Sequence, residues 1–291
     1  MENKKYWIWL SILGIGTKRL DKLFHKYEKI ENIWNAKEYE LIYIEGIGQS
    51  LAHKIASKEY KEKVNNYIEE MENQNIKVIT LQDKEYPDKL KNIFDKPIVL
   101  YVKGNKDILN DFSLGIVGCR ECSEYGKNTA IQIAECLSNN HINVISGMAK
   151  GIDSYAHIGA LKGKEKTIAV VGCGVDVVYP SENYKLYNDI IQNDGAIVSE
   201  YIIGTQPERT YFPARNRIIS GMSDGIIVVE AKEKSGTLIT VDFALEQGKN
   251  VFAVPGNINS KYSKGTNDLI KQGAKPITSL KDILEEYVIW I

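Results

Sequence analysis

The stretch "INVISGMAKGIDSYAHIGAL", residues 142–161, decides the fold of this 291-residue chain. Its first six residues form a short apolar run rich in β-branched side chains, which is typical of a buried strand. Gly147 ends this run and Gly151 follows four residues later, and the remainder has the apolar periodicity of a helix. The stretch therefore predicts a β-strand that passes through a tight turn directly into an α-helix.

Similar units precede and follow this one along the chain. The other apolar runs are "SLGIVG" (113–118), "TIAVVG" (167–172), "AIVSE" (196–200), "GIIVVE" (225–230) and "NVFAVPG" (250–256). Helix-type segments separate them, and short apolar strands alternating with helices indicate a parallel sheet covered on both faces. The sequence predicts an α/β protein with a doubly wound, Rossmann-like parallel sheet.

The amino-terminal region has a different pattern, with one short motif repeated. "LGIGTKRLDKLF" (13–24) and "EGIGQSLAHKI" (45–55) both place Gly-Ile-Gly before a helix-like segment. The pattern resembles the helix-hairpin-helix motif, and the pair resembles a small all-helical SAM-like domain. Such a motif can hold a phosphate at the start of its second helix, or it can be a purely structural hairpin. We expect a helical domain at 1–75 and an extended Rossmann-like domain at 76–285, whose first strands are "IKVITL" and "PIVLYVKG".

Composition excludes some classes of protein and leaves others open. The chain is 43% hydrophobic and 26% charged with a net charge of −1, so it lacks the basic excess of many nucleic-acid binders. Its longest early apolar stretch, "YWIWLSILGIG", is too short for a membrane helix and lacks the layout of a signal peptide. Four cysteines form no evident disulfide framework. We expect a cytoplasmic protein without membrane contact, metal or cofactor.

The Cys119–Cys122 pair has CxxC spacing, which occurs in zinc sites and redox motifs. A zinc site needs a second ligand pair, and no other CxxC or HxxxH spacing is present. A redox role stays open because a predicted strand precedes the motif. The preferred interpretation is a pair of small residues in a strand-to-helix turn.

Ligands of open parallel sheets bind beyond the carboxyl ends of the strands. The candidate residues at those positions are Arg120, Ser146, Gly147, Lys150, Ser235, Gly236 and Thr237. After the fourth strand comes "ERTYFPARNR" (208–217), which contains three of the five arginines of a chain that has 37 basic residues. Guanidinium is a planar fork suited to phosphate, so Arg209, Arg215 and Arg217 predict an oxyanion site. We expect the first and fourth of these strands to be neighbours, which would bring Arg120 to the other arginines.

Each candidate also has a plainer interpretation. Phe212 could stack on a base or pack over the sheet edge, and Asn216 lies beside the arginines. Asp153 could cap its helix, while His157 is better explained by helix packing. "VGCGVDVVYP" has Val177 where a dinucleotide fingerprint needs its third glycine, and no P-loop is present. A nicotinamide or ATP cofactor is therefore not expected.

Together these motifs closely resemble the DNA-processing protein A family (DprA, also called Smf). The residues that carry the resemblance run in order from about 85 to 275: "GIVGCR", "ISGMAKGIDSYAHIGAL", "GCGVDVVYPSEN", "SEY", "FPARNRIISGMSDGIIVVEA", "SGTLIT" and "VFAVPGNINSKYSKGTNDLIKQGA". The resemblance implies recombination mediation during natural transformation. Members bind and protect incoming single-stranded DNA, load the RecA recombinase and dimerise through the Rossmann-like domain, with no catalytic residues.

Carried onto this chain, the resemblance implies a DNA pocket that includes Arg120, the 146–150 loop, Arg209, Phe212 and residues 215–217. Arg215 is the expected phosphate ligand, and Arg217 is alternatively a structural ion-pair partner. This chain departs from the family in having Cys119 where a hydroxyl residue is common. It also has only "DILEEYVIWI" where many members carry a winged-helix domain, so functions of that domain are in doubt.

An enzyme is the alternative hypothesis. "SGTLITVDFALEQGK" resembles a glycine-threonine-glutamate segment of proteins that hydrolyse nucleoside monophosphates in the same broad superfamily. Glu230 and Glu246 would then be the assisting carboxylates. The arginine and aromatic cluster favours a polymeric backbone over one small nucleotide, so binding is the leading hypothesis.

Overall fold

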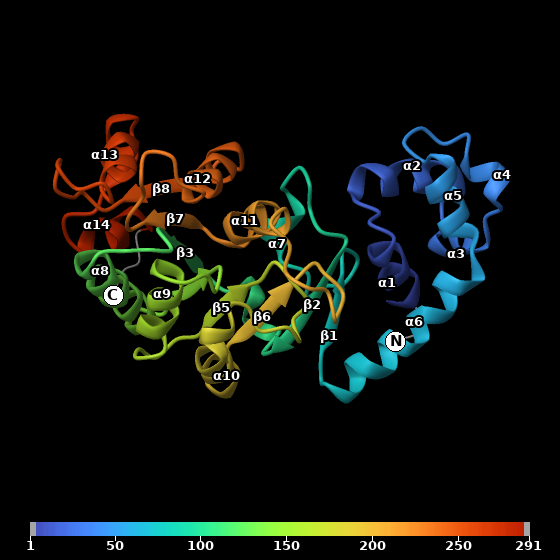
Figure 1. Ribbon diagram of the computed structural model, residues 1–291, viewed down its shortest axis with the longest axis horizontal. Coiled ribbons are helices and arrows are strands. Elements are labelled where there is room, and N and C mark those ends of the chain that lie inside the picture. Colours follow the sequence, from blue (N-terminus) through green and yellow to red (C-terminus); the bar gives the residue numbers. More distant parts are fainter. Residues whose placement is uncertain (1–3, 288–291) are drawn as a thin grey trace.

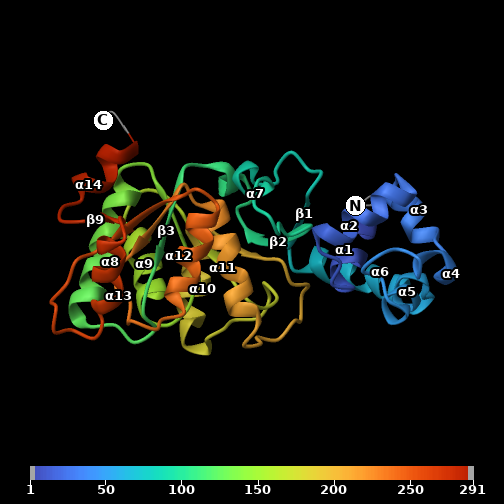
Figure 2. The same cartoon turned by 90° about the horizontal axis from the view of Figure 1, so that it is seen from above.

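A computed structural model of the protein describes residues 4–287 and divides into a helical part and a nine-stranded α/β part (Figure 1). The helical part lies at one end of an elongated molecule, and helices α13 (Lys264–Lys271) and α14 (Lys281–Leu284) lie at the other (Figure 2). Its helices are α1 (Lys4–Ile12), α2 (Thr17–Tyr27), α3 (Ile30–Asn35), α4 (Glu38–Leu41), α5 (Gln49–Ala56) and α6 (Lys58–Asn73).

The two Gly-Ile-Gly motifs form turns that lie next to each other. Gly14 and Gly46 have φ angles of +67° and +83°, a backbone conformation that glycine adopts without strain. Arg19 joins the turns, because its Nε donates to the carbonyl oxygen of Gly46 at 3.1 Å and its Nη1 to that of Gly14 at 3.4 Å. The arginine nearest the amino terminus therefore stabilises the helical repeat.

Helix α1 connects the helical part to the sheet. Trp9 and Leu10 on this helix are fully buried in the helical core. On the sheet side, the hydroxyl groups of Ser11 and Tyr101 are 2.6 Å apart, and Lys4 forms an ion pair with Asp83 at 2.9 Å. The two parts are therefore held together by side-chain contacts as well as by the chain that connects them.

The strands form one mixed sheet in the order β1-β2-β6-β5-β4-β3-β7-β8-β9. Their bounds are β1 (Lys77–Thr80), β2 (Val99–Gly104), β3 (Ser113–Val117), β4 (Asn143–Ser146), β5 (Thr167–Val170), β6 (Ala196–Ser199), β7 (Gly225–Val228), β8 (Asn250–Ala253) and β9 (Lys275–Pro276). Strands β3 to β9 pair in parallel, whereas β2 is antiparallel to both β1 and β6. The predicted parallel Rossmann-like sheet is confirmed, with an antiparallel extension at one edge.

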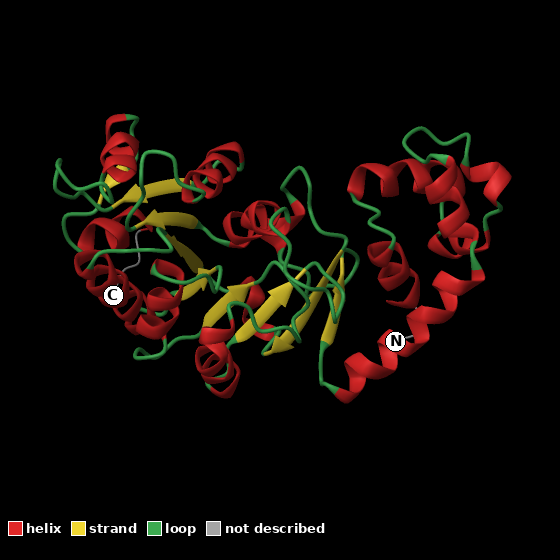
Figure 3. Ribbon diagram, in the orientation of Figure 1, coloured by secondary structure: helices red, strands yellow, loops and turns green. Residues whose placement is uncertain are grey.

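Helices cover both faces of the sheet (Figure 3). They are α7 (Asp88–Lys91), α8 (Glu124–Asn139), α9 (Ile152–Ala160), α10 (Tyr184–Gln192), α11 (Tyr211–Met222), α12 (Thr237–Glu246), α13 (Lys264–Lys271) and α14 (Lys281–Leu284). One core contains apolar residues of α8 and α9, such as Ile133 and Ala156, packed with Ile116 of β3. The other core contains Ile218 of α11 and Val241 of α12, so alternate residues of each strand are buried on opposite faces. Among residues 4–287 no helix is long and apolar enough to cross a membrane.

The expectation that the first and fourth parallel strands are neighbours was wrong. Strand β3 lies between β4 and β7, and β5 and β4 separate it from β6. The chain leaves β6 and returns to place β7 beside β3, so helix α11 must cross back over the sheet. Strands β6 and β3 are three positions apart in the sheet. Helix α11 and the segment before it therefore bring the arginines that follow β6 close to Arg120.

Candidate nucleic-acid interface

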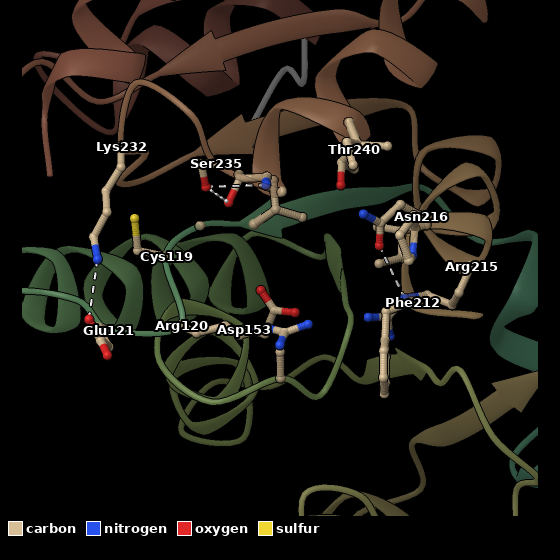
Figure 4. A pocket seen from close by; sticks show the side chains of 18 of the residues that line it. Cys119, Arg120, Glu121, Asp153, Phe212, Arg215, Asn216, Lys232, Ser235 and Thr240 are labelled. Atoms are coloured by element: carbon tan, nitrogen blue, oxygen red, sulfur yellow. Dashed lines mark hydrogen bonds and ion pairs between the residues drawn. The ribbon is translucent and has the colours of Figure 1, made fainter. Parts of the chain in front are cut away.

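An open cleft of about 430 Å³ lies at the carboxyl ends of β3 and β7, where the strand order reverses (Figure 4). We call it the central cleft. Its polar lining residues are Arg120, Glu121, Asp153, Arg209, Arg215, Asn216, Lys232, Lys234, Ser235, Thr237 and Thr240. Five of these side chains are basic and two are acidic, so this cleft is cationic although the whole chain is not. Such a surface suits an anionic ligand.

Three side chains form a layered stack beside the central cleft. The guanidinium carbon of Arg120 lies 5.5 Å from the centroid of the Phe212 ring. The Tyr179 ring lies 5.3 Å from the same ring with a tilt of 30°. Arg120 and Tyr179 are both exposed, so the stack presents a cation and two aromatic rings to solvent. Aromatic rings in this setting can stack on nucleobases of any sequence.

A second, smaller cavity of about 80 Å³ lies against the same stack and is called the side cavity. It is lined by Arg120, Gly147, Ala149, Lys150, Tyr179, Pro180, Phe212 and Arg215. Arg120, Phe212 and Arg215 line both cavities, so an aromatic ring and two guanidinium groups separate two places that can each receive a phosphate. A Cβ atom on Gly147 would lie 2.6 Å from Oδ2 of Asp153 and 2.8 Å from Nη2 of Arg215, so a larger residue here would displace these two buried side chains.

Arg215 is a buried arginine that fastens the ends of two strands. Its Nη1 donates to the carbonyl oxygens of Gly147, at 2.6 Å, and of Val170, while its Nε donates to Asn216. Burial lowers the pKa of Arg215, and the nearby carboxylate of Asp153 opposes that shift. Its guanidinium therefore forms part of the floor between the two cavities.

Asp153 is a buried carboxylate in the floor of the central cleft, two residues beyond the Gly151 that precedes α9. Burial raises its pKa to about 6, although Arg215, Arg120 and two backbone amides act in the opposite direction. It does not cap α9, contrary to one interpretation of the sequence. His157 is buried with its Nδ1 2.7 Å from the hydroxyl of Thr167, and burial lowers its pKa to about 3, which agrees with a packing role.

Arg217 points away from both cavities. Its Nη1 and Nη2 each lie 2.6 Å from a carboxylate oxygen of Glu200, and its Nε donates to the backbone oxygen of Asp95 at 2.7 Å. Only 10% of its side chain is exposed. Arg209, in contrast, is exposed and lines the central cleft. The arginines of "ERTYFPARNR" thus occupy three different environments.

Of the remaining predicted residues, some line a cavity and one is buried within the fold. Ser146 is fully buried and donates to the carbonyl oxygen of Ile116 at 2.6 Å, so its hydroxyl does not line either cavity. Lys150 lines the side cavity and forms an exposed ion pair with Glu182. Asn216, Ser235, Gly236 and Thr237 all line the central cleft. The Ser235 hydroxyl accepts a hydrogen bond from the Thr237 backbone amide at 3.3 Å, just before the first turn of α12.

Sequence reasoning missed Tyr179, Lys232 and Lys234. The two lysines lie in the loop between β7 and α12, and the rule that ligands bind beyond strand ends would have included them. Tyr179 follows no strand directly, because it lies in the long loop after β5 that brings it to the side cavity. Tyr211, considered for stacking on a base, instead stacks on Tyr201 with ring centroids 4.2 Å apart.

Glu230 and Glu246, the two carboxylates that the enzyme hypothesis requires, do not lie together in one site. Glu230 is buried and accepts hydrogen bonds from the backbone amide and the hydroxyl of Ser123. Glu246 is exposed at the opposite end of α12 from Thr237, about 13 Å along the helix. Neither residue lines the central cleft. In the described residues no group of three or more His, Cys, Asp or Glu side chains is arranged to hold a metal.

The fold and the cleft define a Rossmann-like protein with a cationic cleft, flanked by aromatic rings, at the switch point of its sheet. Residues 77–288 match the family described as DNA recombination-mediator protein A, and residues 5–68 match the helix-hairpin-helix motif. The chain therefore belongs to the DNA recombination-mediator protein A (DprA/Smf) family, and the resemblance inferred from its motifs is confirmed.

Individual relatives agree with this assignment. DNA processing protein DprA of Streptococcus pneumoniae is 46% identical over 208 residues, which cover 72% of this chain and 73% of that protein. Protein Smf of Synechocystis is 36% identical over 284 residues, or 96% of this chain and 71% of that protein. The X-ray structure of S. pneumoniae DprA matches with a TM-score of 0.73 and 38% identity over 94% of this chain and 98% of that chain.

A second solved structure concerns the single-stranded DNA binding mode of DNA processing protein A from Helicobacter pylori. It matches with a TM-score of 0.66 and 32% identity, covering 73% of this chain and 96% of that chain.

Proposed function

We propose that this protein binds and protects single-stranded DNA as a recombination mediator, with the two cavities as its DNA site. The observation that carries the proposal is the Arg120–Phe212–Tyr179 stack, which lies between two places for a phosphate. A stacking platform flanked by cations is the arrangement that binds unpaired bases without regard to sequence. The H. pylori relative, described as binding single-stranded DNA, supports the same assignment.

Within this proposal the predicted residues have different roles. Arg120, Arg209 and Lys150 are solvent-accessible cations that contact phosphates, and Phe212 stacks on a base. Ser235, Gly236 and Thr237 offer the amino terminus of α12 to a phosphate. Arg215 forms part of the floor of the central cleft and adds a positive charge there. Arg217 and Ser146 stabilise the fold and do not contact DNA. This assignment replaces the expectation that Arg215 is the foremost phosphate ligand.

Loading of RecA and dimerisation through the Rossmann-like domain are parts of the proposal that rest on the family resemblance. The first is tested by the lag before RecA hydrolyses ATP on single-stranded DNA coated with a single-strand binding protein. An unchanged lag after addition of this protein would contradict it. The second is tested by sedimentation velocity at micromolar concentration, where a monomer alone would contradict it.

The cleft should bind single-stranded DNA in a salt-dependent manner, and Arg209 should account for part of that dependence. Neutralised phosphates release counterions, so the logarithm of affinity falls by about 0.7 per contact for each tenfold rise in salt. Arg209→Ala is therefore expected to reduce the salt slope by about 0.7. The measurement is fluorescence anisotropy with oligothymidylate and a matching duplex over a range of salt concentrations.

The control for this titration is Lys271→Ala, which removes an exposed cation at the carboxyl end of α13 that lines neither cavity. It should leave both slope and affinity unchanged. Binding that is independent of salt, or equal binding of duplex and single strand by the parent protein, would contradict the proposed function.

Affinity for single-stranded DNA should rise as the pH falls through about 6, the pKa to which burial raises Asp153. Below this pH the carboxyl group is neutral, so the cleft has one negative charge fewer opposite the phosphates. The charged side chains that act on it are Arg215 and Arg120, and both oppose the rise of its pKa. A change of about 1 kcal/mol, roughly fivefold in affinity, is expected between pH 7.5 and 5.

Asp153→Asn is the matched variant for the pH experiment. It should bind at pH 7.5 about as tightly as the parent does at low pH, and its affinity should no longer change across this window. If the variant keeps the parent's pH dependence, Asp153 is not the titrating group.

A further inference from the structure

The loop between β8 and α13 is fastened beside the central cleft. The backbone amide of Ala231, in the loop that follows β7, donates to the carbonyl oxygen of Tyr262 at 2.9 Å. The amide of Gly265 donates to the carbonyl oxygen of Ala231 at 2.8 Å. A Cβ atom on Gly265 would lie 2.8 Å from the Ala231 Cβ, so the two segments are in close contact. Tyr262 is thus held next to the residue that precedes Lys232.

Two lysines flank the half-buried ring of Tyr262. The Nζ atom of Lys232 lies 5.5 Å from the ring centroid, and that of Lys261 lies 5.0 Å from it. Lys232 also lines the central cleft and pairs with Glu121 at 3.2 Å. Figure 4 shows Lys232 and Glu121 at one end of the cleft, with Phe212 and Arg215 at the other. Lys232 therefore connects the cleft to the aromatic ring beyond it.

This arrangement repeats the chemistry of the Arg120–Phe212 stack at a second place. In both, a cation that lines the cleft lies over an aromatic ring. An ammonium over a half-buried ring at the surface is held weakly and can turn to a phosphate, which leaves the ring free to stack on a base. Lys234, also exposed and lining the cleft, adds a cation near Lys232.

We propose that Tyr262, with Lys232 and Lys261, is a second stacking platform for the strand that leaves the central cleft. The ring takes one base, and the two ammonium groups contact the phosphates on either side of it. The inference rests on the proposed function, because it extends the path of the same single strand. It places the path along the ends of β3, β7 and β8.

The test compares two lengths of oligothymidylate by fluorescence anisotropy at low salt. A short strand of about five nucleotides can fill the central cleft, whereas one of about 15 nucleotides can also reach Tyr262. Tyr262→Ala should weaken binding of the long strand about tenfold and leave the short strand unaffected. Tyr262→Phe keeps the aromatic face and should match the parent on both lengths.

Lys261→Glu provides a second variant at an exposed position with no part in the core. It should weaken the long strand at least as much as Tyr262→Ala does, with the loss shrinking at high salt. Tyr43→Ala, which removes an 83% exposed tyrosine from the helical part, is the control for loss of a surface ring and should have no effect. Thermal melting checks that each variant is folded.

The outcomes separate this inference from the function on which it rests. Equal affinity of the parent, Tyr262→Ala and Lys261→Glu for the long strand overturns the second platform, and shows that the lysine–tyrosine contacts only hold the loop. Equal losses on both lengths also overturn it, because the ring would then act through the shape of the central cleft. If the parent binds neither strand, the proposed function itself fails.

Discussion

Replacing Arg120 with alanine is expected to weaken binding of single-stranded DNA about a hundredfold at low salt. Arg120 lines both cavities and lies over the Phe212 ring, so its removal takes away a phosphate ligand and one layer of the stack. Hydrogen bonds to a charged partner contribute about 1.5–3 kcal/mol, and the lost stacking adds to this. The loss should be similar for every base sequence, since phosphates and aromatic stacking do not distinguish bases.

The matched variant is Arg120→Lys, which keeps the charge but not the planar fork. Lysine is a hydrated point charge, so this variant should recover part of the affinity and little of the stacking. Anisotropy titrations with oligothymidylate and a mixed-sequence strand measure both variants. A loss confined to one sequence, or parent-like affinity for Arg120→Ala, would show that Arg120 does not form the centre of the site.

Arg217→Ala is expected to destabilise the fold without removing a DNA contact. The pair with Glu200 is nearly buried, with 10% and 17% of the two side chains exposed. Removing one partner of a buried pair leaves an uncompensated carboxylate, which costs about 4 kcal/mol. For a domain of this size the thermal midpoint should fall by roughly 10 °C. At a temperature where the variant is folded, its affinity for single-stranded DNA should equal that of the parent.

A surface pair provides the comparison for Arg217. Lys22 and Glu45 lie 3.0 Å apart with 40% and 89% of their side chains exposed, so Lys22→Ala should change stability by less than about 1 kcal/mol. Differential scanning calorimetry on both variants makes the comparison. If Arg217→Ala melts with the parent but loses DNA affinity, then Arg217 belongs to the DNA site after all.

The sequence predicted the strands of the parallel sheet but not their order. Each apolar run from 113 to 256 contains a strand, because burial on both faces requires continuous apolar character. Strand order depends on where each crossover helix passes, and no local pattern specifies that. No local pattern specifies the antiparallel pairing of β2 with β6 either, because it joins residues that are nearly a hundred positions apart in the sequence.

The sequence predicted where the candidate site lies but not which way all of its side chains point. The ends of the strands indicated the cleft, whereas the directions of the Arg215 and Arg217 side chains depend on a helix at 211–222 that the sequence analysis did not predict. Residues two apart on a helix point about 200° from each other, so one arginine faces the cleft and the other faces Glu200. Tyr179 and Lys232 lie in loops, where side-chain direction depends on tertiary contacts rather than on spacing.

The hydrogen bonds of Arg215 have a consequence for how the cleft receives a ligand. Because this guanidinium already holds the carbonyl oxygens of Gly147 and Val170, the floor of the cleft is ordered before any ligand arrives. Preorganised groups lose little conformational entropy on association, whereas exposed side chains such as Arg209 and Lys234 must be immobilised. Folding therefore supplies the rigid half of the complex, and binding has to order only the outer cations and the strand.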